Sequence, residues 1–442
     1  MAESKKKKTL WNFVEHLEGD KVVWIIVLML ILVSIVCMFS STSRLLKEGE
    51  TRIDLVKSQF TTVFMGLGLI LVCYNIKSVN FFRNLSKYGF LASLVLLVLL
   101  VSKIDTGFIK SISLNGARRI LSIKGQQLHV FEAVKIMMVM YLSWAVDALK
   151  KGELKGPKEV IWQKILYIYG PFLITTALIL PGSNSSAIFI GGIMFMVILL
   201  GGGNLKELSI LAASVLILAI GSYGIYKLSD GKYMQRVGTF MNRVSDKDWE
   251  EIYLNSTDRK ERQTALDKIR QPVSAKIAIK EGGLIGKGPG QSTQRYVVPD
   301  ISEDYMYSFI IEEYGFVGGL LVLILYVSLM ARGALIARNC GNDLYAALCV
   351  AGLTLLISGQ AFLHMCVNTE IGPMTGQTLP LISHGNFAFL CFCGAFGVIL
   401  SFSRIAARRI EKETLMAEPL MEMHEDVGAR LQDLEELEEY DI

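Results

Sequence analysis

The sequence predicts an all-α, polytopic membrane protein with about ten transmembrane helices, and three observations support this fold class. Of its 442 residues, 52% are hydrophobic and only 19% are charged, which is unusual for a soluble domain of this length. Apolar runs of about 17–25 residues recur along the chain, and each could cross roughly 30 Å of hydrocarbon as a helix. Lysines and arginines gather in alternate connections, as expected for loops on the cytoplasmic side.

The apolar runs divide the chain into three regions. Residues 1–21 are a basic, polar N-terminus without a cleavage signal, so the first apolar run is predicted to be an uncleaved span. Residues 22–409 are predicted to form a ten-span membrane domain that holds the catalytic site. Residues 410–442 are an acidic cytoplasmic tail. The expected spans are approximately 22–40, 58–76, 88–102, 129–148, 162–180, 186–201, 207–226, 306–331, 343–365 and 382–403.

Ten spans place both termini in the cytoplasm and the longest connection, about 227–305, outside the membrane between the seventh and eighth spans. The tail holds 12 acidic and 2 basic residues, which leaves 43 basic and 29 acidic residues on the rest of the chain. A basic membrane domain suits anionic headgroups or a phosphate-bearing substrate, although basic cytoplasmic loops alone would explain it. The outer loop that contains Lys110, Arg118, Arg119 and Lys124 is also basic. Either the predicted topology is wrong there, or these cations bind an anionic substrate.

A short acidic segment, from Pro299 to Glu313, is the strongest candidate for chemistry. Asp304 stands where an apolar helix begins, so its carboxylate could serve the helix N-terminus, with Ser302 or Asp300 as the cap. Glu312 and Glu313 lie two turns into the apolar run, where a carboxylate is costly and is functional by default.

Two further groups carry polar side chains into apolar surroundings. Glu132 and Lys135 are three residues apart on one helical face, where they could form part of a site or an ion pair that joins two helices. The stretch from Gly282 to Ser292 includes Lys287, Gly288 and Gly290, and its glycines could wrap a phosphate or act as a hinge. It lacks the features of a P-loop or a dinucleotide fingerprint.

Prolines and glycines interrupt the apolar pattern between Pro373 and Asn386, in a stretch that includes Ser383 and His384. Broken backbone at membrane depth requires cover by protein or a water-filled cavity. The five histidines and seven cysteines form no metal-type cluster. We therefore expect no bound metal from the protein side chains, no disulfide framework and no redox chemistry.

Four motifs together resemble the SEDS family of bacterial cell-wall polymerases, the FtsW, RodA and SpoVE group, over almost the whole membrane part. They are Asn115-Gly-Ala-Arg118-Arg119, the glycine loop through Gly290-Gln-Ser292, the acidic segment with Glu312-Glu313-Tyr-Gly315, and Pro373-x-Thr-Gly376-x-x-Leu-Pro380-x-x-Ser383-x-Gly385. The chain departs from the family pattern at Ile120, at Leu128–Phe131, at Pro181–Ser186 and at His384–Ala388. The stretches 291–295 and 375–379 look more like the division-type FtsW than the elongation-type RodA.

This resemblance implies a peptidoglycan glycosyltransferase that polymerises lipid II on the outer face of the cytoplasmic membrane, with undecaprenyl pyrophosphate as leaving group. Asp304 falls on the position of the family's essential aspartate and would be the general base. The implied substrate-binding residues are Arg118, Arg119, Lys287, Gly288, Gly290, Ser292, Glu132, Lys135 and Ser383, with Asp300, Glu312 and Glu313 in support.

The implied partners are a class B penicillin-binding protein, because the chain has no transpeptidase domain of its own, and other membrane proteins of the division machinery. No nucleic acid is expected. A divalent cation, Mg²⁺ or Mn²⁺, would suit the pyrophosphate leaving group. Two other classes of function fit the same sequence: a lipid flippase or transporter with broken helices, and a scaffold that recruits division proteins through its acidic tail.

Overall fold

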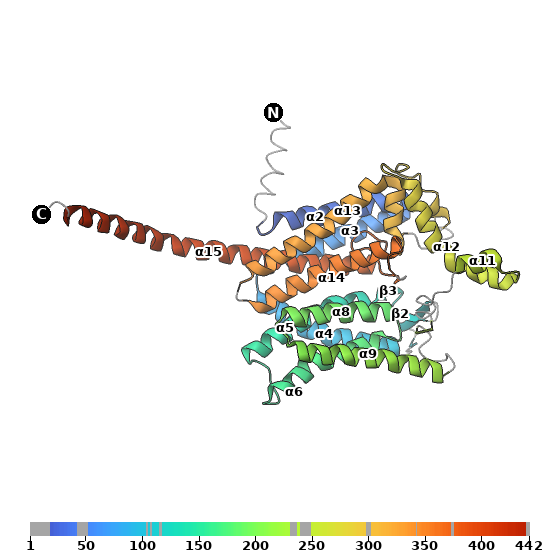
Figure 1. The fold of residues 1–442 in the computed structure, drawn as a ribbon, viewed down its shortest axis with the longest axis horizontal. Coiled ribbons are helices and arrows are strands. Elements are labelled where there is room, and N and C mark those ends of the chain that lie inside the picture. The colour runs from blue at the N-terminus through green and yellow to red at the C-terminus, as the bar shows by residue number, and fades with distance from the viewer. Residues whose placement is uncertain are drawn as a thin grey trace.

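The computed structural model describes residues 18–41, 52–102, 105–106, 108–114, 117–229, 237–238, 249–297, 302–341, 343–372 and 375–438. Long helices run side by side in one bundle, and a small sheet lies at one end of it (Figure 1). We call this end the sheet end. At the opposite end lie α6 and the lysines of residues 150–158, and we call it the basic end. The predicted supporting residue Asp300 falls outside the described residues.

A helical segment lies at each of the ten predicted spans. These segments are α2 (Lys21–Ser41), α3 (Arg52–Asn75), α4 (Val79–Val101), α5 (Val130–Lys151), α6 (Val160–Lys164) with η2 (Ile165–Tyr169) and α7 (Gly170–Ile179), α8 (Asn184–Leu200), α9 (Leu205–Leu228), α13 (Met306–Asn339), α14 (Leu344–Asn368) and α15 (Asn386–Glu438).

Among the described residues, seven helices are long and apolar enough to cross a membrane. The three remaining segments differ for identifiable reasons. α5 carries three charged side chains within its apolar run, a π-helical turn separates α6 from α7, and α8 has only 17 residues. The helical membrane fold is confirmed, whereas the number of spans stays a prediction.

The connection between α4 and α5 contains a small sheet within the helical fold. It forms an antiparallel sheet of β1 (Ile109–Leu114), β2 (Ala117–Ile123) and β3 (Gln126–His129) in the order β1-β2-β3. Ile123 pairs with Gln126 across a two-residue turn in which Lys124 and Gly125 have φ of 50° and 83°. Two successive positive φ values are the geometry of a tight hairpin turn. The sheet carries Arg118 and Arg119 to the mouth of the bundle.

The connection from α9 to α13 is also structured over much of its length. Its described part contains α11 (Trp249–Asn255), α12 (Arg259–Gly282) and the 3₁₀ turn η3 (Gln294–Tyr296). α12 packs against α13 at the sheet end. α15 continues beyond the bundle as one helix through most of the acidic tail (Figure 1).

Ion pairs tie the helices together at the basic end. Arg83 of α4 lies 3.0 Å from both the Asp147 and the Asp343 carboxylates, which joins α4 to α5 and α14. Asp20 caps the start of α2 and pairs with Arg332 of α13. These ion pairs fix the positions of the helices that carry the polar groups of the sheet end.

Candidate active site

Asp304 lies in the turn before α13, and α14 determines its position. Tyr305 stands directly before the first residue of α13, and its side chain makes no capping hydrogen bond. Instead, the N–H groups of Tyr307 and Ser308 donate to His364 Nε2 (3.3 Å) and Asn368 Oδ1 (2.9 Å). Asn368 Nδ2 in turn donates to the Asp304 carbonyl at 3.1 Å. The capping expected from Ser302 is therefore replaced by side chains of a neighbouring helix.

Gln360, His364 and Asn368 form what we call the polar ladder, because they recur every four residues on one face of α14. All three are at most 1% exposed. His364 Nδ1 lies 2.7 Å from the Gln377 carbonyl, and Gln360 Nε2 donates to the Thr378 carbonyl at 2.9 Å. The ladder thus fixes the start of α13 and the broken stretch 375–383 against each other.

The predicted pairing of Glu132 and Lys135 is confirmed. Lys135 is 1% exposed, and its Nζ lies 2.7 Å from Glu132 Oε1 and 2.7 Å from Gln360 Oε1. A longer contact of 3.3 Å reaches Gln377 Oε1. The buried ammonium is therefore paired and hydrogen-bonded, as a charge in such surroundings must be, and it links α5 to the polar ladder.

Asp304 and Arg119 converge on one glycine. A methyl group built on Gly376 would lie 3.7 Å from Asp304 Oδ2 and 3.9 Å from Arg119 Nη1. Arg119 comes from β2, and its Nε donates to the Gly182 carbonyl at 3.2 Å. A carboxylate and a guanidinium therefore lie within contact distance of the same glycine at the sheet end. Of Arg118 the structure describes only the backbone, which pairs with Ser113 across the sheet.

The turn that holds Asp304 rests on the stretch before α15. Ser383 Oγ donates to the Glu303 carbonyl at 2.8 Å, and the His384 N–H donates to the Ser302 carbonyl at 2.8 Å. Burial lowers the pKa of His384, and the nearby His129 lowers it further. Burial also lowers the pKa of His129. Both imidazoles are therefore held neutral beside the site.

The glycine loop serves a second cluster, which we call the carboxylate clasp: Glu312, Glu313, Lys287, Ser292 and Ser40. Glu312 is fully buried and its carboxylate accepts from Lys287 Nζ (2.8 Å) and Ser292 Oγ (2.5 Å). Glu313 accepts from Ser40 Oγ of α2 at 2.6 Å. The clasp joins α2, α13 and the connection between α9 and α13.

Glycines let this loop lie directly on the backbone of α13. That helix breaks at Gly315, where φ is 70° and ψ is −175°. The Lys287 and Gly288 N–H groups donate to the Glu312 and Glu313 carbonyls, both at 2.9 Å, and the Gly290 N–H donates to Ser40 Oγ. A Cβ on Gly286 would lie 2.3 Å from the Glu313 carbonyl oxygen. Only glycine allows this approach.

A family model described as "Cell cycle protein" and named for FtsW, RodA and SpoVE matches residues 20–408. The chain belongs to this family. It is 27% identical over 345 residues to the probable peptidoglycan glycosyltransferase FtsW of Coxiella burnetii, which covers 76% of this chain and 84% of that protein. It is 26% identical over 347 residues to the stage V sporulation protein E of Bacillus subtilis, which covers 77% and 85%.

Two solved structures share the fold. Rod shape determining protein RodA of Thermus thermophilus superposes with a TM-score of 0.58 at 20% identity, over 88% of this chain and 98% of that chain. The second is a chain from a peptidoglycan synthase complex, in a structure on the coordination of polymerization and crosslinking. It has a TM-score of 0.61 at 19% identity, over 88% of this chain and 98% of that chain. Within the FtsW/RodA/SpoVE family, relatives named FtsW favour that type for this chain.

The structure of this family member separates the predicted site residues into two groups. Asp304, Arg119, Glu132, Lys135 and Ser383 meet at the mouth of the bundle through the polar ladder. Lys287, Gly288, Gly290, Ser292, Glu312 and Glu313 meet in the carboxylate clasp. Substrate contact by this second group stays a prediction, because the structure occupies its polar atoms with one another.

Sequence reasoning missed His364 and Gln377, and it did not use Gln360 or Asn368. The available signal was the spacing: polar residues at 360, 364 and 368 interrupt an otherwise apolar helix on one face. In the described part of the chain, no three His, Cys, Asp or Glu side chains are grouped so as to hold a metal ion.

Proposed function

We propose that this chain is a peptidoglycan glycosyltransferase that polymerises lipid II into glycan strands during cell division. It would act at the outer face of the bacterial cytoplasmic membrane, with both termini in the cytoplasm. The names of the FtsW relatives support the activity and the division role. The proposal rests most on one observation: the Asp304 carboxylate and the Arg119 guanidinium lie beside the same glycine, Gly376.

Asp304 is assigned the role of general base. It would accept the proton of the 4-hydroxyl of the acceptor N-acetylglucosamine as that oxygen attacks the anomeric carbon of the growing chain. Undecaprenyl pyrophosphate then departs. A base must lie within hydrogen-bond reach of its proton, and the contacts of Asn368 and Ser383 with the turn hold Asp304 in a fixed place.

Arg119, with Arg118 beside it on β2, is assigned to the pyrophosphate. A guanidinium binds phosphate oxygens in pairs, and charge neutralisation assists a leaving group that already departs readily. The pyrophosphate is also a ligand for a divalent cation such as Mg²⁺ or Mn²⁺, which we include as a component carried by the substrate. A class B penicillin-binding protein would supply the transpeptidase, and other membrane proteins of the division machinery would join the complex.

The decisive experiment compares two neighbouring carboxylates. The chain is purified with its penicillin-binding partner, given labelled lipid II, and assayed for polymer. Asp304→Asn should lower the polymerisation rate by about 10²–10⁴-fold, which is the usual contribution of general base catalysis. The matched control is Glu303→Gln, an exposed neighbour that should retain most of the rate.

Polymerisation that survives Asp304→Asn would contradict the assigned base. Lipid II translocation without polymer, measured in the same vesicles, would instead support the transporter class. Normal division in cells that carry Asp304→Asn, with failure on removal of residues 410–442, would support the scaffold class.

A further inference from the structure

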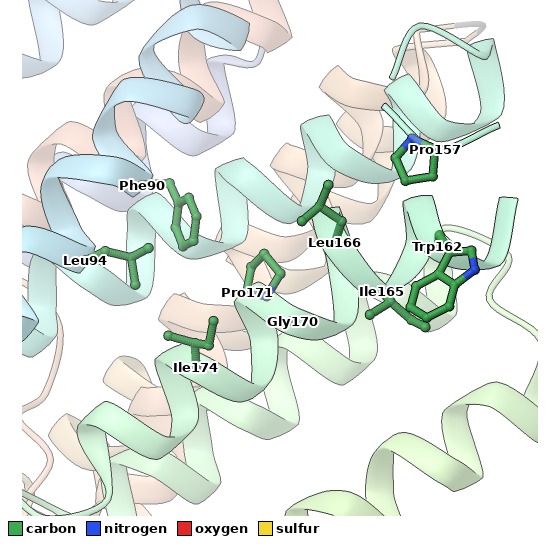
Figure 2. A pocket seen from close by; sticks show the side chains of 9 residues that line it. All are labelled: Phe90, Leu94, Pro157, Trp162, Ile165, Leu166, Gly170, Pro171 and Ile174. Carbon is green, nitrogen blue, oxygen red and sulfur yellow. The ribbon is translucent and has the colours of Figure 1, made fainter. Parts of the chain in front are cut away.

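An apolar cavity opens on the flank of the bundle, between α4 and the α6–α7 segment (Figure 2). It has a volume of about 430 Å³ and an almost wholly apolar lining. Phe90 and Leu94 of α4 form one wall, and Ile174 of α7 lies opposite. Pro157 and Trp162 lie at its end nearest the basic end of the bundle. The volume is in the range of pockets that hold a small ligand.

The backbone beside the cavity departs from a regular α-helix. Residues 165–169 form a π-helical turn, a feature often found at functional sites. Gly170 follows, and a Cβ there would lie 2.7 Å from the Ile165 carbonyl oxygen. Two side chains of this segment hold the loop above it: Tyr167 Oη donates to the Lys155 carbonyl at 2.7 Å, and Gln163 Nε2 donates to the Pro157 carbonyl at 2.9 Å.

Positive charge surrounds the mouth of the cavity. Residues 150–164 contain five lysines and two glutamates. Lys151 and Lys164 are paired with Asp147 and Glu207. Lys155 and Lys158, on either side of Pro157, are exposed, and neither forms an ion pair with any residue that the structure describes. Their charge is thus available to a ligand.

α4 carries a further lysine about one helical turn before the cavity residue Phe90. Lys87 lies three residues before Phe90, and its Nζ lies 4.8 Å from the centre of the Trp144 ring. From Lys87 to Leu94 the helix rises by about 10 Å. The cations therefore lie at the basic end, and the apolar walls run from there toward the middle of the bundle. This polarity matches that of a lipid, with its headgroup at the surface and its chain inside.

From this geometry we propose that the cavity binds one anionic phospholipid, such as a phosphatidylglycerol. An acyl chain lies between Phe90, Leu94 and Ile174, and the phosphate is held by Lys155 and Lys158. Basic pockets between membrane helices are known to select anionic headgroups. The site is separate from the candidate active site, because Lys135 and Lys151 lie toward opposite ends of α5.

The test measures lipid binding, with no readout of polymerisation. The purified chain in a zwitterionic detergent is titrated with dioleoylphosphatidylglycerol or dioleoylphosphatidylcholine, and bound lipid is counted by native mass spectrometry. The wild type should bind the anionic lipid more tightly. Replacing Lys155 and Lys158 together by Gln should weaken that binding by about 25-fold, at roughly fivefold for each lysine. Lys412→Gln, an exposed lysine of α15, is the matched charge control and should leave binding unchanged.

A second pair of variants tests the apolar half. Ile174→Trp should fill the cavity and abolish retention of the anionic lipid, whereas Ile217→Trp on the exposed face of α9 should not. If Ile174→Trp fails to fold, the lysine variants decide alone, because both lysines are at the surface. Equal binding of the two lipids, or unchanged binding in the double lysine variant, would overturn the proposal.

Discussion

Glu312 Oε1 lies 2.8 Å from Lys287 Nζ, and this contact joins a fully buried carboxylate of α13 to the connection between α9 and α13. Burial lowers the pKa of Lys287, but its hydrogen bonds to Glu281 and Glu312 outweigh burial, and the pKa is raised. The lysine is therefore charged at neutral pH. The pair explains how Glu312 can be buried two turns into an apolar helix, and the hydrogen bond from Ser40 serves Glu313.

Glu312→Gln should destabilise the fold by about 3 kcal/mol, because it leaves a buried set of donors without their charged acceptor. Lys287→Gln should cost a similar amount, about 3 kcal/mol, since it leaves the buried Glu312 carboxylate without its cation even though Ser292 and Thr293 still donate to it. Thermal unfolding midpoints in detergent would measure both changes. Glu281→Gln removes the exposed partner of the same lysine and is the control. An equal loss in Glu281→Gln and Glu312→Gln would contradict this account.

Gly286→Ala should destabilise the fold by about 3 kcal/mol, because the new methyl group would meet the Glu313 carbonyl oxygen. Gly125→Ala separates this clash from backbone strain. Gly125 has a similar positive φ, 83° against 91°, but a methyl group there would have no atom within 4 Å. That variant should cost about 1 kcal/mol. Similar midpoints for the two variants would show that the loop does not pack on α13 as described.

Gly376→Ala tests the space between Asp304 and Arg119. Its methyl group would make only ordinary contacts, at 3.7 Å and 3.9 Å, so the midpoint should fall no further than in Gly125→Ala. The rate of lipid II polymerisation should fall by about 100-fold, since a small displacement of reacting groups is enough for such a loss. The two quantities are measured on one preparation. A full rate in Gly376→Ala would place the substrate elsewhere.

The stability of the fold should fall as the pH drops below 6.5. Burial lowers the pKa of His129 and of His384 in the folded protein, so the unfolded chain binds more protons in this range. The stability contributed by the two neutral imidazoles is fully present above pH 6.5 and is lost as the pH falls toward their lowered pKa values. Unfolding midpoints at pH 7.5 and 5.5 would show the loss. A double variant, His129→Gln with His384→Gln, should have a smaller pH dependence, and an unchanged dependence would contradict the assignment.

The helices could be predicted because each follows from a local property of the chain. Apolar runs such as 22–40 and 343–365 correspond to α2 and α14 within a few residues, since a span needs only length and apolar side chains. The sheet before α5 could not be found in the same way. Its strands are short and mix apolar with polar residues, and the turn at Lys124-Gly125 has no marker stronger than one glycine.

The candidate site also combines features that local sequence patterns predict with features that depend on packing. Sequence alone singled out Asp304, Glu312, Glu313, Glu132 and Lys135, because charged groups next to apolar runs are costly wherever they stand. It also predicted the pairing of Glu132 with Lys135, which are neighbours on one helical turn. Without the family resemblance it ranked Glu312 at least as high as Asp304, since both are carboxylates close to the membrane boundary.

The tertiary structure gives the two carboxylates different surroundings through contacts between residues far apart in the chain. Asn368 binds the Asp304 carbonyl across 64 positions, and Ser40 reaches Glu313 across 273. Such pairings depend on how the helices pack, which no local pattern encodes. The sequence by itself determined that the chain is a helical membrane protein with carboxylates at its boundary. Only the packing turned Glu312 and Glu313 inward onto their partners and left Asp304 opposite Arg119.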